Sequence, residues 1–419
     1  MAALRGRVSR PELGSGWVVL AASFLVTFCT WNAYTTFGVF IPILSQEFGW
    51  SRGAISLAFT LTMLIGGPLG FVVGAMVDRY GPRTLTAVST ALVGIAFLLA
   101  STMSALWHFY LLMGLATGLG MSSLYLVPIA TMSRWFPARR GLAMGIVLSS
   151  LGVAYIVSAP LAAFLFEMFG WRTTYLVLGG SVCAIALPAT CLIKNPPVQP
   201  TDPASAGAPD GPDGQARRVL APVQGLTVRE AIGHRSLWIL LVVWFLLAFA
   251  QMMVQVHVVP YATDRGLSLE HASLAVTVYG FSTIAGRLVF GAAADRLGTK
   301  LVFWLCVALE LASTTWLMAL PSRWSLYAVM VLFGLGANGT DTAYLKVVGE
   351  IFGTRSIGAV IGLLTLGWRG GAAAGPAVAG YVYDATGFYT IALGLATAAV
   401  LACGGLFLGI RSSAERGSR

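Results

Sequence analysis

The chain has 419 residues, of which 57% are hydrophobic and only 10% are charged. This composition leaves too little polar surface to cover a water-soluble globule, so we expect the chain to lie in a lipid bilayer. The formal net charge of +10 does not indicate a nucleic-acid partner. The basic residues stand in short segments between apolar runs, where they set the orientation of a membrane protein.

Apolar runs of the length that a bilayer demands, about 20 residues at ~1.5 Å rise each, follow one another along the chain. After the sixth run, the segment 194–235 is rich in Pro, Ala, Gly, Asp and Arg, and it cannot bury enough apolar area to fold alone. We therefore predict an all-α membrane protein with twelve transmembrane helices at 17–44, 54–77, 84–104, 107–132, 141–166, 173–193, 237–261, 272–294, 301–320, 325–349, 357–382 and 388–410.

The chain is predicted to divide into an N-terminal six-helix half at 1–193, a cytoplasmic linker at 194–235 and a C-terminal six-helix half at 236–419. An internal repeat supports this division. The pattern Gly-x-x-x-Asp-Arg-x-Gly-x-Arg that begins at Gly74 recurs 217 residues later at Gly291, with lysine in its last position. Because a displacement of six helices preserves orientation in the membrane, the two halves are predicted to be parallel repeats.

Lysine and arginine are distributed unequally between the two ends of the predicted helices. Nineteen fall on the side of the termini and the linker, whereas only four fall on the other side: Arg52, Arg172, Arg265 and Arg323. By the positive-inside rule, we predict a multi-pass protein of the cell inner (plasma) membrane with both termini in the cytoplasm. The three remaining cations lie inside predicted helices: Arg287, Lys346 and Arg369.

The duplicated loop resembles the cytoplasmic signature loop of the major facilitator superfamily. Its glycines let a helix end approach a neighbour closely, and its aspartate can pair with an arginine at the membrane face. The resemblance implies a conformational latch in a carrier that alternates between two states, and the alternative is a plain tight turn with orienting charges. The predicted latch residues are Gly74, Asp78, Arg79, Arg83, Asp295 and Arg296.

Two shorter stretches resemble the signatures of the monocarboxylate transporter family and its bacterial oxalate/formate exchanger relatives. Gly14-Ser15-Gly16-Trp17 opens the first predicted helix, and WFPARRGLAMG, from Trp135 to Gly145, opens the fifth. The alternatives are an interfacial tryptophan anchor and arginines that only set orientation. The resemblance implies the major facilitator fold and a small organic anion as substrate.

Two arginines are predicted near the middle of the bilayer, Arg287 about 12 Å and Arg369 about 18 Å from the cytoplasmic ends of their helices. A guanidinium at that depth costs at least ~2.5 to 3.5 kcal/mol and stays charged, so it must face a wet cavity or a counter-ion. Oxalate/formate relatives bind substrate carboxylate with an arginine on helix eight and a lysine on helix eleven. The resemblance implies this role for Arg287 and Arg369, and the alternative is an internal ion pair with Asp341.

Asp341 on the tenth predicted helix is the candidate for proton coupling, or for a counter-ion when the site is empty. Other polar and aromatic residues at middle depth could complete a substrate pocket, although most residues of this kind only hydrogen-bond between helices. The titratable His257 could sense pH, bind the anion or join two helices. The candidate substrate contacts beyond the two arginines are His257, Tyr125, Asn32, Tyr34, Tyr279 and Asn338.

Proton-coupled monocarboxylate transporters carry a lysine in helix one and an aspartate one turn before the helix-eight arginine. Here the first predicted helix has no lysine. The position four residues before Arg287, where those transporters have the aspartate, is Thr283. These departures leave H⁺ symport linked to Asp341, anion exchange or facilitated diffusion. We predict a secondary active transporter of a small organic anion, a monocarboxylate or similar carboxylate, that works by alternating access and is proton-coupled or exchanges anions. The alternatives are an exporter of neutral or cationic molecules and a receptor that does not transport. No cofactor, metal site or enzymatic constellation is predicted.

Overall fold

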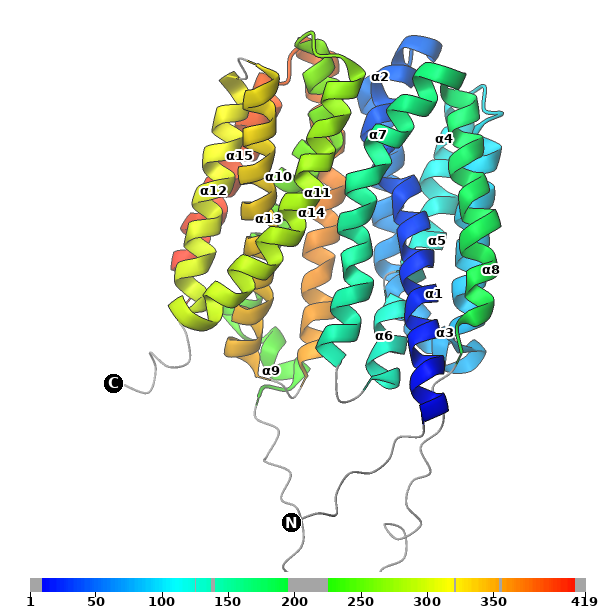
Figure 1. Ribbon diagram of the computed structural model, residues 1–419. Coiled ribbons are helices and arrows are strands. Elements are labelled where there is room, and N and C mark those ends of the chain that lie inside the picture. The colour runs from blue at the N-terminus through cyan, green and yellow to red at the C-terminus, as the bar shows by residue number, and fades with distance from the viewer. Residues whose placement is uncertain are drawn as a thin grey trace, which may run out of the picture.

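The computed structural model describes residues 10–124, 126–136, 140–194, 225–319, 322–353 and 356–410. Helices make up one bundle in this part of the chain (Figure 1). The first half contains α1 (Arg10–Thr35), α2 (Phe37–Phe48), α3 (Arg52–Ala100), α4 (Leu106–Phe109), η1 (Tyr110–Ala116), α5 (Thr117–Leu124), α6 (Leu126–Trp135), α7 (Arg140–Ser181), η2 (Val182–Ala186), α8 (Leu187–Ala189) and η3 (Thr190–Leu192). The second half contains α9 (Val228–Ile232), α10 (Arg235–Asp264), α11 (Leu269–Leu297), α12 (Thr299–Ala319), α13 (Arg323–Phe352), α14 (Ile357–Thr386) and α15 (Thr390–Leu408).

The predicted twelve crossings are confirmed. α3 and α7 each contain two crossings, because the backbone turns at Gly81 and Gly170, where φ is 79° and 77°. α1 with α2 forms one crossing, the run from α4 to α6 forms another, and α10 to α15 form the last six. Within the described residues, eight helical segments are long and apolar enough on composition alone to cross a membrane.

The two-fold repeat appears in the backbone as well as in the sequence. Glycines with positive φ end or interrupt helices at Gly49 and Gly266, at Gly81 and Gly298, and at Gly170 and Gly387, and the members of each pair are 217 residues apart. Only glycine adopts such angles without a steric cost. Because the offset is the same for all three pairs, equivalent turns occur at equivalent positions in the two halves, as expected for parallel repeats.

The first crossing is interrupted, whereas the sequence predicted a single helix at 17–44. α1 ends at Thr35, and α2 contains Pro42, which has no N–H to bond back to residue 38. Gly38 lies at this break and touches α10 of the other half, because a Cβ there would lie 2.6 Å from the carbonyl oxygen of Val256. The break therefore coincides with a close contact between the halves.

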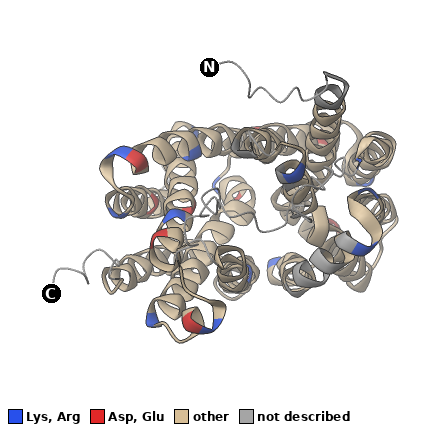
Figure 2. Cartoon of the chain, turned by 90° about the horizontal axis from the view of Figure 1, so that it is seen from below, with Lys and Arg blue, Asp and Glu red and all other residues tan. Residues whose placement is uncertain are grey.

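We call the end of the bundle where α1 begins and α15 ends the terminal end, and the opposite end the distal end (Figure 1). Viewed from the terminal end, the helices form two groups side by side, and few residues are charged (Figure 2). α3 packs on α14 and α7 packs on α11 between these groups.

Glycines make the distal contacts between halves very close. A Cβ at Gly380 of α14 would lie 2.7 Å from the Cα of Gly53, and one at Gly280 of α11 would lie 2.8 Å from the backbone nitrogen of Ile156. Thr277 also donates a hydrogen bond of 2.8 Å to the carbonyl oxygen of Ile156. The two halves are therefore joined closely on the distal side of Arg287.

The end of the predicted linker contains structure that its composition did not predict. The short helix α9 has a capping box, in which Thr227 accepts from the Glu230 N–H and the Glu230 carboxylate accepts from the Thr227 N–H. Leu226 donates a backbone hydrogen bond of 2.9 Å to Phe352 at the end of α13. This segment thus docks on the second half, while residues 195–224 lie outside the described residues.

Candidate functional site

Arg287 of α11 lies between the two halves and is partly exposed. Its charge acts electrostatically on Asp341 of α13, on Tyr279 of its own helix and on Tyr155 of α7 in the other half. Across the described residues, no ion pair or hydrogen bond engages its guanidinium. The direct ion pair with Asp341 that the sequence left open is therefore not formed in this structure.

Arg369 of α14 reaches from the second half to the first. A Cβ at Gly66 of α3 would lie 2.8 Å from its Nη1 atom, and one at Gly67 would lie 3.6 Å from its Cγ atom. Its charge also acts on Tyr34 of α1. The two glycines leave the space that the arginine side chain occupies, so Arg369 lies across the boundary between the halves.

Asp341 is partly exposed and is held by an aromatic neighbour. Trp244 of α10 donates a hydrogen bond of 3.3 Å from Nε1 to Oδ1 of Asp341. The indole is itself fixed by a stacked contact with Tyr344, with ring centroids 4.6 Å apart. The carboxylate therefore has a fixed position within electrostatic reach of Arg287, and sequence reasoning did not identify Trp244.

A cluster of aromatic and amide groups joins the halves next to Arg287. Tyr155 of α7 donates a hydrogen bond of 3.0 Å to Oε1 of Gln255 of α10, and its ring meets Tyr279 edge to face at 5.2 Å. Asn338 donates a hydrogen bond of 3.0 Å to Thr283 beside Tyr279. The structure therefore brings the predicted Tyr279 and Asn338 together near Arg287.

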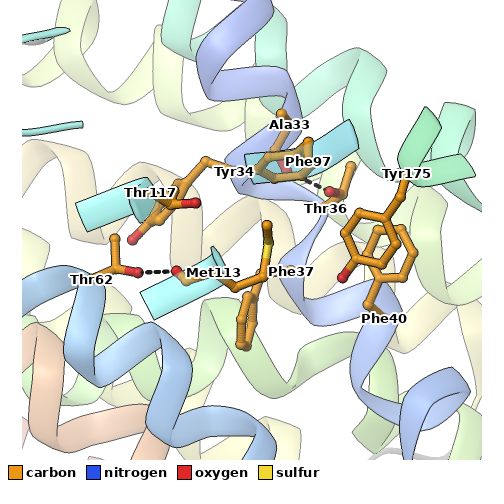
Figure 3. A pocket seen from close by; sticks show the side chains of 10 residues that line it. All are labelled: Ala33, Tyr34, Thr36, Phe37, Phe40, Thr62, Phe97, Met113, Thr117 and Tyr175. Carbon is orange, nitrogen blue, oxygen red and sulfur yellow. Dashed lines mark hydrogen bonds between the residues drawn. The ribbon is translucent and has the colours of Figure 1, made fainter. Parts of the chain in front are cut away.

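Among the remaining candidates of the first half, Tyr34 lies within electrostatic reach of Tyr155 in this cluster and of Arg369. Tyr34 lines a small cavity inside the first half, together with Phe37, Thr62 and Met113 (Figure 3). Asn32 is 6% exposed, and no group in the described part of the chain hydrogen-bonds its Oδ1 atom. The predicted substrate contact Tyr125 lies outside the described residues.

His257 occupies a different place from the one expected for a substrate contact. It is 3% exposed in the distal part of α10. Its Nε2 atom lies 2.9 Å from the carbonyl oxygen of Pro376 and 3.2 Å from the Ser56 hydroxyl, and Nδ1 lies 3.0 Å from the Tyr389 hydroxyl. These contacts join α10 to α3, α14 and the start of α15, which is the alternative role of His257 as a hydrogen-bonding link between helices.

His257 belongs to a set of contacts that we call the distal closure, made by Arg52, Gly53, Ser56, His257, Asp264, Pro376, Asp384 and Tyr389. Arg52 of α3 binds both carboxylate oxygens of Asp264 on α10, at 2.6 and 2.7 Å. Asp384 of α14 accepts the backbone N–H groups of Arg52 and Gly53, at 2.9 and 2.8 Å. Charge-assisted bonds therefore tie the halves together at the distal end.

The predicted latch residues lie at the terminal end and are arranged differently. Arg79, Arg83 and Arg296 are exposed, and Asp295 forms an ion pair with Lys346 of α13, within the second half. The surroundings of Gly74 and the side chain of Asp78 lie outside what the structure describes. Among the described latch residues, no ion pair joins the two halves, so the latch stays a prediction.

Glu310 of α12 is completely buried in the second half. The Glu310 carboxyl contacts the hydroxyl of Thr340, and that hydroxyl also lies 2.7 Å from the carbonyl oxygen of Gly336. The Nε2 atom of Gln251 lies 3.4 Å from Oε1 of Glu310. A hydroxyl has only one hydrogen, so a protonated Glu310 that donates to Thr340 lets Thr340 donate to Gly336. This arrangement avoids a buried negative charge.

Replacing Glu310 with glutamine is therefore expected to change stability by less than ~1 kcal/mol, because the amide keeps the shape and can donate to Thr340. Replacing it with alanine leaves a cavity and is expected to cost about 2 to 4 kcal/mol. Thermal melting of the purified protein in detergent measures both. An equally large loss with glutamine would show that this carboxyl is held as an anion.

Comparisons with known proteins agree with this architecture. The sequence profile of the Major Facilitator Superfamily matches residues 23–272 and 257–419. The chain belongs to the major facilitator superfamily. Members of this superfamily are transporters, so the chain is a membrane transport protein and not an enzyme.

Several curated relatives of this superfamily member are monocarboxylate transporters. Monocarboxylate transporter 12 of Rattus norvegicus is 28% identical over 445 residues, which cover 99% of this chain and 89% of that protein. Monocarboxylate transporter 11 of Homo sapiens is 27% identical over 414 residues, covering 96% and 84%. Monocarboxylate transporter 13 of Bos taurus is 25% identical over 409 residues, covering 96% and 91%.

Solved structures of the superfamily share the fold. The nucleoside transporter NupG superposes with a TM-score of 0.70 at 16% identity, covering 94% of this chain and 99% of that chain. A bacterial homologue of the human lysosomal transporter Spinster, solved in an inward-facing and occupied conformation, gives a TM-score of 0.73 at 16% identity, covering 97% and 98%.

Proposed function

We propose that this protein is a secondary active transporter of a small organic anion, a monocarboxylate or similar carboxylate, that works by alternating access. The observation that carries the proposal is Arg287, a permanent cation between the halves that is partly exposed and has no direct ion-pair partner among the described residues. Such a charge is costly in a membrane protein and marks a substrate or ion pathway. The names of the monocarboxylate transporter relatives support the same substrate class.

In this proposal, the substrate carboxylate lies between Arg287 and Arg369, which come from two different helices of the second half. Arginine suits this role because its planar fork can bind both oxygens of a carboxylate. Asp341 balances the charge of Arg287 while the site is empty. Taking up a proton at Asp341, or exchanging one anion for another, keeps the charge of the site balanced when the substrate enters.

We propose further that the terminal end faces the cytoplasm of the inner (plasma) membrane, in keeping with the excess of basic residues there. The distal closure then faces outward, and the structure is an inward-facing state. The proposed moving units are the six-helix halves at 1–193 and 236–419, joined by the linker at 194–235. Rocking of these units would open the distal closure and close the terminal end.

An exporter of cationic compounds is the second candidate, because Asp341 is also partly exposed and the Trp244 indole lies next to it. Flux into proteoliposomes separates the two functions. We expect uptake of at least one acid from a panel of lactate, pyruvate, formate, oxalate and larger aromatic acids, with competition by other short carboxylates. Competition by lipophilic cations, with no effect of carboxylates, would favour the exporter.

The coupling mode is tested in the same proteoliposomes. Uptake of the transported acid that rises with an inward proton gradient is expected for H⁺ symport. Uptake that instead requires a carboxylate on the opposite side is expected for exchange. A protein that binds the acid with no flux under either condition would be a receptor, and the transport proposal would fail.

A further inference from the structure

His257 lies where contacts from both halves meet, and its hydrogen bonds define its protonation state. A carbonyl oxygen can only accept, so the 2.9 Å contact with Pro376 places a proton on Nε2. The Tyr389 hydroxyl accepts from Nη1 of Arg52 at 3.0 Å. Its own hydrogen is then free to be donated to Nδ1 of His257 at 3.0 Å. The distal closure therefore fits a neutral imidazole in one tautomer.

A second proton on His257 disrupts this arrangement. With a hydrogen on Nδ1, the ring would donate toward the Tyr389 hydroxyl, whose own hydrogen would lose its acceptor. The added charge would also repel Arg52, which the Tyr389 hydroxyl contacts directly. The ring is almost completely buried, so water cannot compensate for either effect.

The acids of the closure are already hydrogen-bonded to other groups, and among the described residues no carboxylate hydrogen-bonds the imidazole; the charge of Asp384 acts on it only through space. The titratable and charged groups packed around His257 come from α3, α10, α14 and the start of α15, and they are Arg52, Tyr261, Asp264, Tyr383, Asp384 and Tyr389. Both carboxylate oxygens of Asp264 bind the Arg52 guanidinium. Both oxygens of Asp384 accept backbone N–H groups of Arg52 and Gly53.

We propose that His257 is a proton sensor that controls the distal closure: the neutral ring permits closure, and the protonated ring holds the distal end open. This inference rests on the alternating-access transporter proposed above, and it assigns a pH-dependent regulation to its outward side. Opening would expose the ring to water, where a proton on Nδ1 no longer meets the Tyr389 hydroxyl and Arg52. Protons would therefore bind the open form in preference to the closed form, so acid on the distal side favours opening and alkali favours closure.

The experiment measures the distal opening without any substrate. Spin labels are placed at Gln46→Cys in the first half and Glu270→Cys in the second, both exposed at the distal end, in a background without the native cysteines. Pulsed electron paramagnetic resonance in lipid nanodiscs gives the distance distribution at pH 8 and pH 5. We expect the ratio of closed to open populations to fall at least ~10-fold at pH 5.

Two histidine variants make the assignment specific. His257→Gln keeps a group that can donate to Pro376 and accept from Tyr389 but cannot gain a proton, so it is expected to stay closed at both pH values. The matched control is His271→Gln, because His271 also lies at the distal end but contacts Arg323 and Tyr327 outside the closure. This control is expected to keep the full pH response.

A wild-type distance distribution that does not change between pH 8 and pH 5 overturns the proposal, whether or not the variants fold. A pH response that survives in His257→Gln, or that disappears in His271→Gln, also overturns it. Since no organic anion is present, these outcomes are independent of the uptake assays, and anion transport could stand while the proton sensor fails.

Discussion

Arg287→Ala is expected to lower uptake of the transported carboxylate at least ~100-fold, with normal amounts of folded protein. A hydrogen bond to a charged group contributes about 1.5 to 3 kcal/mol, and about 2.7 kcal/mol corresponds to a factor of 100. The loss also leaves Asp341 without the positive charge that acts on it. Initial rates of uptake into proteoliposomes, normalised to the amount of incorporated protein, measure the effect.

Two further variants control the Arg287 experiment. Arg323→Ala removes an arginine at the distal end, where its partner is His271, and it should transport at the wild-type rate. Arg287→Lys keeps the charge but loses the planar fork, so an intermediate rate is expected. Wild-type uptake by Arg287→Ala would remove this residue from the substrate site.

Gly371→Ala is expected to cause the largest loss of stability, about 3 kcal/mol or more, through a clash with the backbone of α10. A Cβ at Gly371 of α14 would lie 2.0 Å from the carbonyl oxygen of Phe245 and 2.9 Å from the backbone nitrogen of Phe249. Neither atom belongs to a flexible side chain, so the two helices must separate and lose packing along their length. Melting curves and the yield of monodisperse protein in detergent measure the loss.

Gly394→Ala of α15 is the matched control, since a Cβ there meets no atom within 4 Å. We expect no loss of stability from this variant, and a small gain is consistent with the higher helix propensity of alanine. If both glycine variants melted at the same temperature, the close approach of α10 and α14 would not be a determinant of the fold.

The fold was predictable because its signals are local or periodic. Apolar runs of bilayer length and the loop repeated at Gly74 and Gly291 predicted twelve helices in two parallel halves, and the structure confirms both. The break at Thr36 was not predicted, because Pro42 alone does not reveal that Gly38 packs against α10. The helix α9 was not predicted, because it has only five residues and lies in a segment whose overall polar composition indicates a linker.

The candidate site was predictable only in part. Arg287 and Arg369 were identified because a charge inside an apolar run is visible in the sequence, and the structure places both between the halves. Trp244 was missed because its role depends on the contact with Asp341, 97 residues away. The sequence shows how far along its helix His257 lies. It does not show the neighbours from α3 and α14 that place His257 in the distal closure.

The proposal that a substrate carboxylate binds at Arg287 is tested most directly by equilibrium binding to the purified protein. Titration calorimetry in lipid nanodiscs, with the acid that proteoliposomes take up, should show saturable binding to the wild type. It should show binding weakened at least ~100-fold in Arg287→Gln and unchanged in Arg323→Ala. Equal affinity for the acid in wild type and Arg287→Gln would contradict the proposed anion site.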